Sequence, residues 1–191
     1  MNQERLNEIE KPLIQIVERD VVPALGCTEP ISLALAAATA AKYLGKTPER
    51  IEAKVSPNLM KNGLGVAVPG TGMVGLPIAA AIGALGGDPE GELEVLKHIT
   101  PEQVSQAKAM LDKKLVNVDI HQTDHILYSE AVLFANNDWV KIAIQDQHTN
   151  IILIEKNGEV IFEKEQDECA DCDPYDIFKQ VSAREIFEFS C

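Results

Sequence analysis

The spacing of apolar residues along the chain changes near residue 115. Upstream, apolar residues mostly recur every three or four positions, which is the period of a helix. Downstream, they fall in short runs rich in β-branched residues, which favour strands separated by turns such as 136–138. The predicted helices are 3–20, 31–44, 73–86, 91–98, 101–113 and 175–189. The predicted strands are 50–56, 116–122, 125–136, 139–146, 149–158 and 159–165.

This order of elements predicts an α+β fold. Amino-terminal helices with a Gly-rich loop come first, and an antiparallel sheet meander built mainly from 116–165 and a carboxyl-terminal helix follow. A parallel sheet with the 70–75 loop at a strand end would instead favour nucleotide binding.

Charge and glycine divide the chain into two parts. The 191 residues carry a formal charge of −13. Residues 1–87 hold 8 basic and 8 acidic residues, whereas 88–191 hold 9 basic and 22 acidic residues. We therefore predict one part at 1–87, helical and Gly-rich, and a second at 88–191 that contains the sheet. The acidic excess excludes a basic protein that binds nucleic acid, because it would repel phosphate.

The uncharged segment 62–87 is the one stretch with some resemblance to a membrane span. Its glycines, with Pro69 and Pro77, would leave the backbone poorly satisfied in lipid, so a buried helix after a Gly-rich loop is favoured. The charged amino terminus lacks the apolar run of a signal peptide, and four cysteines are too few for a disulfide framework. We expect a cytoplasmic protein that binds neither membrane nor nucleic acid.

The Gly-rich loop at 70–75, GTGMVG, fits the dinucleotide-binding fingerprint in spacing. Its context differs, because Pro69 interrupts the preceding strand and no β-rich run follows the helix. A packing or anion-binding loop is therefore favoured over a nucleotide site.

Cys27 lies in the sequence GCTEP, where Thr28 can cap the following helix and Pro30 suits its first turn. Backbone amides at a helix N-terminus stabilise a thiolate and lower the thiol pKa. A small buried apolar residue is the alternative, and position alone leaves both open. Cys169 and Cys172 have metal-site spacing, but no second pair accompanies them, so thiols without a function are favoured there.

Three stretches, 21–30, 56–87 and 148–151, closely resemble the UPF0597 family. That family includes L-cysteine desulfidases and is related to the α part of bacterial iron–sulfur L-serine dehydratases. The resemblance implies a cytoplasmic enzyme that uses a [4Fe–4S] cluster to eliminate a β-substituent from an amino acid. The products would be pyruvate and ammonia, with sulfide when the substrate is L-cysteine.

The same resemblance implies roles for individual residues. Cys27 matches the cysteine proposed as the base that removes the α-proton. Six polar residues match family motifs and are expected to hold the substrate carboxylate and amine: Asn58, Lys61, Asn62, His148, Thr149 and Asn150.

The resemblance also places the cluster-binding cysteines in a carboxyl-terminal part that this sequence does not contain, so no metal ligand is expected within the chain. We expect the amino-terminal part of a desulfidase-like enzyme, which alone is colourless and inactive. Its partner would be the missing carboxyl-terminal half or a separate cluster-bearing chain, and self-association is a further expectation. Two alternatives stay open: a serine dehydratase-like deaminase, and a non-catalytic anion-binding or partner module.

Overall fold

The computed structural model describes residues 3–164 and 174–190 and contains two compact units. The larger unit comprises residues 24–165, and the smaller comprises 1–23 together with 166–191. The boundary at residue 87, drawn from charge and glycine content, lies inside the larger unit. Within the described ranges, no helix combines the length and apolar character needed to cross a membrane.

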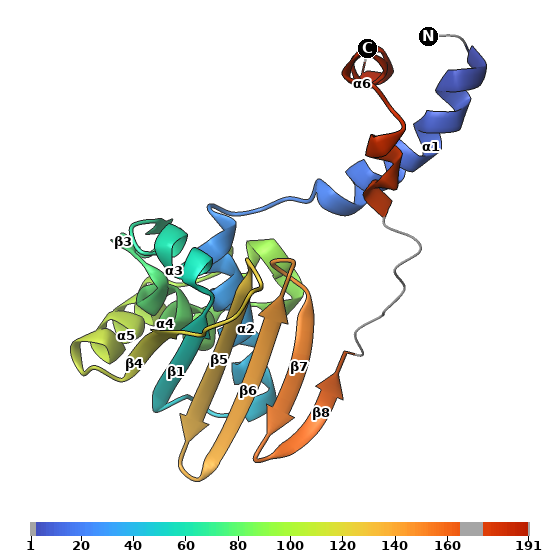
Figure 1. Ribbon diagram of the computed structural model, residues 1–191. Coiled ribbons are helices and arrows are strands. Elements are labelled where there is room, and N and C mark those ends of the chain that lie inside the picture. The colour runs from blue at the N-terminus through green and yellow to red at the C-terminus, as the bar shows by residue number, and fades with distance from the viewer. Residues whose placement is uncertain (1–2, 165–173, 191) are drawn as a thin grey trace. The chain divides into compact units, whose positions relative to one another are not determined.

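A mixed six-stranded sheet forms the larger unit, with the order β4-β1-β5-β6-β7-β8 (Figure 1). The α+β fold is confirmed, and β5 to β8 form the predicted antiparallel meander. The strands are β1 (Arg50–Val55), β4 (Val116–Ile120), β5 (Tyr128–Ala135), β6 (Asp138–Gln145), β7 (Ile151–Lys156) and β8 (Glu159–Glu163).

The sheet differs from the prediction at β1, which lies between β4 and β5. Strand β4 pairs with β1 in parallel, so the sheet is not wholly antiparallel. The cause is the long helical connection between these two strands, since parallel neighbours require a crossover. Strand β1 alternates strictly between exposed and buried residues, so one face of the sheet points into the core.

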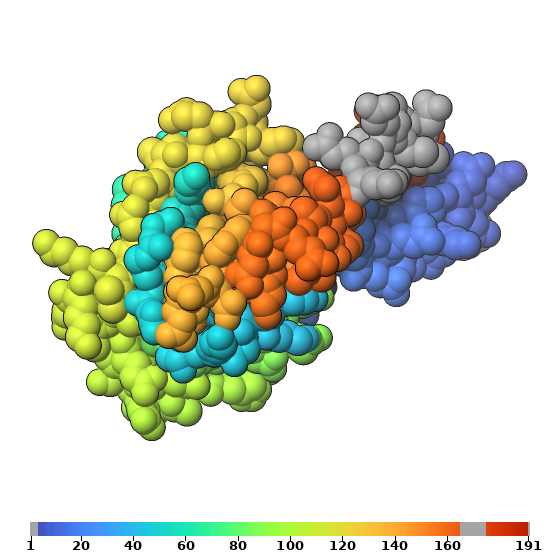
Figure 2. Space-filling model, turned by 90° about the horizontal axis from the view of Figure 1, so that it is seen from below, coloured from blue at the N-terminus to red at the C-terminus, as the bar shows by residue number. Residues whose placement is uncertain are grey.

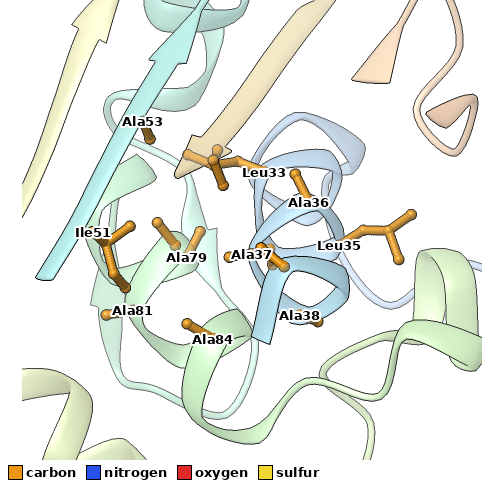
Figure 3. Packing of buried hydrophobic residues seen from close by; sticks show 14 of the residues in the cluster. Leu33, Leu35, Ala36, Ala37, Ala38, Ile51, Ala53, Ala79, Ala81 and Ala84 are labelled. Atoms are coloured by element: carbon orange, nitrogen blue, oxygen red, sulfur yellow. The ribbon is translucent and has the colours of Figure 1, made fainter. Parts of the chain in front are cut away.

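Helices α2 (Thr28–Leu44) and α4 (Leu76–Gly86) pack together beside this inner face. Figure 3 shows Ala37 of α2 and Ala79 of α4 between the two helices, with Ile51 of β1 next to α4. At Gly83 an added Cβ would lie 2.3 Å from the carbonyl oxygen of Ala34, so only glycine fits this approach. Seen from below, the yellow-green residues near 100–115 and the orange residues of β7 and β8 lie on opposite sides of the larger unit (Figure 2).

The connection from β1 to β4 holds the remaining elements of the larger unit. These are α3 (Pro57–Gly63), β2 (Ala67–Val68), β3 (Met73–Val74), the 3₁₀ helix η1 (Pro89–Glu94) and α5 (Pro101–Asp112). The helix predicted from residue 73 starts at Leu76, because β2 and β3 form a hairpin before it. The helix predicted over 91–98 is the short η1 followed by turns.

The smaller unit contains α1 (Gln3–Asp20), the 3₁₀ helix η2 (Pro174–Lys179) and α6 (Ala183–Ser190). One continuous helix over 175–189 was the wrong prediction, because Ser182 and Glu185 form a capping box that begins α6. The Glu185 amide donates to the Ser182 hydroxyl at 3.3 Å, and the Glu185 carboxylate accepts from the Ser182 amide at 2.8 Å. Arg5 of α1 forms an ion pair with Glu185 at 2.9 Å.

Candidate functional site

Cys27 is the N-cap residue of α2 and is exposed. The prediction that Thr28 caps the helix was wrong by one position, since Thr28 is its first residue. Gly26 precedes Cys27 with φ +85°, and an added Cβ there would lie 2.7 Å from Cγ of Pro69. The turn into α2 therefore packs against the segment that leads into the Gly-rich loop.

Glu29, in the first turn of α2, joins Cys27 to α3. The Cys27 thiol donates to Oε2 of Glu29 at 2.8 Å. The Asn62 side-chain amide donates to Oε1 of the same carboxylate at 3.5 Å, which is a long hydrogen bond. Two residues predicted for the site thus meet on one carboxylate. The sequence predicted no role for Glu29, although it lies two residues after Cys27 in GCTEP.

This carboxylate raises the pKa of the Cys27 thiol, whereas a helix N-terminus alone would lower it. The hydrogen bond to Glu29 is the main cause that raises the pKa of Cys27, and partial burial adds to it. Backbone amides of Thr28 and Glu29 act in the opposite direction. Helix-end stabilisation of an exposed charge is worth less than about one pKa unit, so the adjacent carboxylate dominates. Cys27 is therefore a thiol at neutral pH, and the expectation of a lowered pKa was wrong.

The ionised form of Glu29 is favoured in return. The hydrogen bond from Cys27 lowers the pKa of this carboxyl group, against the opposing effect of burial. Its side chain is half-buried, and it accepts hydrogen bonds from a thiol and an amide, which are both neutral. Glu29 thus places a negative charge at the N-terminus of α2, where the helix dipole stabilises it.

His148 lies in the turn between β6 and β7 and is half-buried. Burial lowers the pKa of its imidazole, while the charge of Glu29 acts in the opposite direction. The imidazole is therefore neutral at pH 7. Glu29 thus hydrogen-bonds to residues of the motifs around 27 and 62, and its charge acts on the imidazole of His148.

The other predicted residues of the β6–β7 turn shape the turn itself. The Asn150 side-chain amide donates to the carbonyl of Gln145 at 2.8 Å, and its Oδ1 accepts from Lys164 at 2.7 Å. Thr149, the residue before Asn150, is half-buried. Asn150 thus holds the backbone that carries His148, rather than presenting a free amide.

Helix α3 carries Asn58, Lys61 and Asn62, and all three are exposed. The Ser56 hydroxyl fixes the start of α3 by accepting from the Leu59 amide at 3.3 Å and by donating to the carbonyl of Ile126 at 2.7 Å. Residues three and four apart share one face of a helix, so Asn58 lies on the same side as Lys61 and Asn62.

The Gly-rich loop closes the β2–β3 hairpin. The buried Thr71 hydroxyl donates to the carbonyl of Val68 at 2.8 Å and accepts from the Met73 amide at 3.0 Å. Gly70 and Gly72 have positive φ angles, as this turn requires. A dinucleotide fingerprint connects a parallel strand directly to a helix, whereas here a two-stranded antiparallel hairpin precedes α4. The geometry favours a packing loop.

The described residues contain no set of ligands for a metal cluster. They include one cysteine, Cys27, because Cys169, Cys172 and Cys191 lie outside the described residues. In the same ranges no group of three His, Cys, Asp or Glu residues is arranged to hold a metal ion. A [4Fe–4S] cluster needs three or four converging thiolates, so these residues do not fit it.

Comparison with known proteins identifies close relatives, although no family model matches the chain. The chain is 59% identical over 187 residues to the UPF0597 protein of Actinobacillus pleuropneumoniae serotype 3, covering 96% of this chain and 42% of that protein. The UPF0597 protein of Yersinia enterocolitica is 55% identical over 180 residues, or 93% and 41% of the two chains. The UPF0597 protein YhaM of Salmonella gallinarum is 49% identical over 193 residues, or 99% and 44%. The chain spans about two fifths of the length of these curated relatives.

Proposed function

Because the chain belongs to the UPF0597 family, we propose that it supplies part of the active site of a cytoplasmic iron–sulfur-dependent carbon–sulfur lyase. The reaction is α,β-elimination of sulfide from L-cysteine, and with one water it gives pyruvate and ammonia. The observation that carries the proposal is the convergence of the Cys27 thiol and the Asn62 amide on the Glu29 carboxylate.

Cys27 takes the α-proton in this proposal. The Cα–H bond breaks, its electron pair forms the Cα=Cβ double bond, and the Cβ–S bond breaks so that sulfide leaves. The resulting 2-aminoacrylate becomes an imine, which water hydrolyses to pyruvate and ammonia. A base must be deprotonated before it acts, so Cys27 first loses its own proton to the solvent to which it is exposed.

The charges around Cys27 suit an amino acid. Glu29 is anionic and hydrogen-bonds to neutral groups, so its carboxylate is suited to receive the substrate ammonium. Lys61, exposed on α3, carries the opposite charge and is suited to the substrate carboxylate. Asn58 and Asn62 offer amides on the same helix. In the β6–β7 turn, His148 and Thr149 offer polar groups, and Asn150 holds the turn in place.

The [4Fe–4S] cluster belongs to the proposal for the whole enzyme and not to the residues described above. We assign its ligands to a part of the enzyme outside this chain, either the remaining length of the protein or a separate cluster-bearing chain. The role of this chain's own residues is to bind the amino acid and move its α-proton.

The test uses a protein that carries this sequence at the full length of its relatives, reconstituted anaerobically with iron and sulfide. We expect a brown protein that releases sulfide from L-cysteine, whereas the 191-residue chain alone should stay colourless and release none. Pyruvate formation from L-serine is measured in parallel, because the same elimination can expel hydroxide. Faster turnover of L-serine would make the enzyme a deaminase, and turnover of neither substrate would refute the proposal.

A further inference from the structure

Both oxygens of the Glu29 carboxylate are engaged at the site. Oε2 accepts the hydrogen bond of the Cys27 thiol at 2.8 Å, and Oε1 faces the Asn62 amide at 3.5 Å. The first contact sets the direction of the S–H bond, and the second, a long hydrogen bond, reaches the carboxylate from α3. The orientation of the thiol therefore depends on a side chain two residues further along α2.

In the described part of the chain, Glu29 of α2 is the charged group whose charge acts on this thiol. The 3₁₀ helix η1, which accepts a hydrogen bond from the Leu25 amide through Leu93, carries Glu90, Glu92 and Glu94, and none of these acts on the thiol pKa. The segment 62–87, which includes the hairpin packed against Gly26, has no charged residue. Glu29 is thus the charged group that hydrogen-bonds to the thiol, and a thiolate at 2.8 Å from it would face a like charge.

We propose that Glu29 is the positioning residue of Cys27: its carboxylate orients the S–H bond and holds the proton on sulfur. The catalytic meaning of this assignment rests on the proposed function, because a base that is held protonated must be released before it can act. A ligand ammonium that neutralises the carboxylate would remove the like-charge penalty and raise the thiolate fraction. The fraction of Cys27 in the deprotonated form, which can accept a proton, would then be largest when an amino acid is bound.

The shifts in pKa agree with this assignment from both partners. The hydrogen bond to Glu29 raises the pKa of the Cys27 thiol, and the same bond lowers the pKa of the Glu29 carboxyl group. A carboxylate acceptor paired with a neutral thiol donor produces both directions at once.

The test measures the alkylation of Cys27 by iodoacetamide as a function of pH. Cys169, Cys172 and Cys191 are replaced by serine so that one thiol remains, and mass spectrometry follows the rate. Since the thiolate is the reactive form, the midpoint of the profile reports the thiol pKa. Glu29→Gln should move this midpoint down and speed alkylation about threefold or more at a pH below both midpoints, because the gain in thiolate fraction exceeds the loss in its nucleophilicity.

Two variants and one reference control this measurement. Glu102→Gln removes the same charge from the exposed first turn of α5 and should leave the midpoint unchanged. Glu29→Asp keeps the charge on a shorter side chain and should give an intermediate midpoint. The urea-unfolded wild-type chain gives the midpoint without Glu29 contact, which should lie below the native one. This last comparison holds even if the variants at residue 29 do not fold.

A Glu29→Gln midpoint equal to or above that of the wild type would overturn the assignment, as would a native midpoint below the unfolded one. Alkylation does not depend on turnover, so the two proposals fail separately. A shifted midpoint in a protein without elimination activity would refute the proposed function alone. Elimination activity with an unshifted midpoint would refute the role of Glu29 alone.

Discussion

The start of helix α2 and its long middle stretch differ in almost every physical respect. From Pro30 to Ala40 its residues are buried, mostly small and apolar, and packed against α4 and the sheet. Its first turn, with the preceding Cys27, is exposed or half-buried and carries a thiol, a hydroxyl and a carboxylate. Packing thus fixes the helix along most of its length, and the polar end is held in place by that packing. Substitutions should therefore separate stability from chemistry along one helix.

The largest expected loss of stability is at the contact of α2 with α4. Gly83→Ala would place a Cβ 2.3 Å from the Ala34 carbonyl oxygen, which is backbone and cannot move away alone. We expect the free energy of unfolding in urea to fall by about 2–3 kcal/mol. Gly91→Ala is the matched control, because nothing lies within 4 Å of its added Cβ. Equal stabilities of the two variants would contradict the close packing.

A smaller effect is expected at the buried polar contact between α2 and β5. The hydroxyls of Ser32 and Ser129 lie 2.9 Å apart, and both side chains are fully buried. Ser32→Ala should cost about 1–2 kcal/mol, because it leaves the Ser129 hydroxyl buried without this partner. Replacing both serines by alanine should recover part of that loss in the same urea measurement. A double variant that loses the sum of the single losses would contradict the pairing.

The smallest effect on stability is expected from His148. Burial lowers its pKa in the folded chain, so the unfolded chain binds the proton first as the pH falls below about 6.5. The free energy of unfolding should therefore decrease between about pH 7.5 and pH 5.5, above the range in which Glu29 titrates. His148→Gln should lose less stability over this interval. The same loss in both proteins would show that His148 is not the group responsible.

The sequence predicts best what local patterns determine. Alternation and turn residues predicted β5 to β8. The position of β1 in the sheet could not be predicted from the sequence, because its pairing with β4 depends on a long crossover and not on neighbouring residues. The role of Glu29 was missed for a related reason. A helix N-terminus indicates a lowered thiol pKa, and only the side-chain geometry shows that a carboxylate reverses it.

The most direct test of the site compares Cys27→Ser with the wild type in the full-length, cluster-loaded protein. A hydroxyl is a much weaker base than a thiolate near neutral pH, so sulfide release from L-cysteine should fall by about 100-fold or more. The visible absorbance of the cluster should stay unchanged, because Cys27 is assigned to proton transfer. Sulfide release at the wild-type rate, or loss of the cluster in the variant, would contradict that assignment.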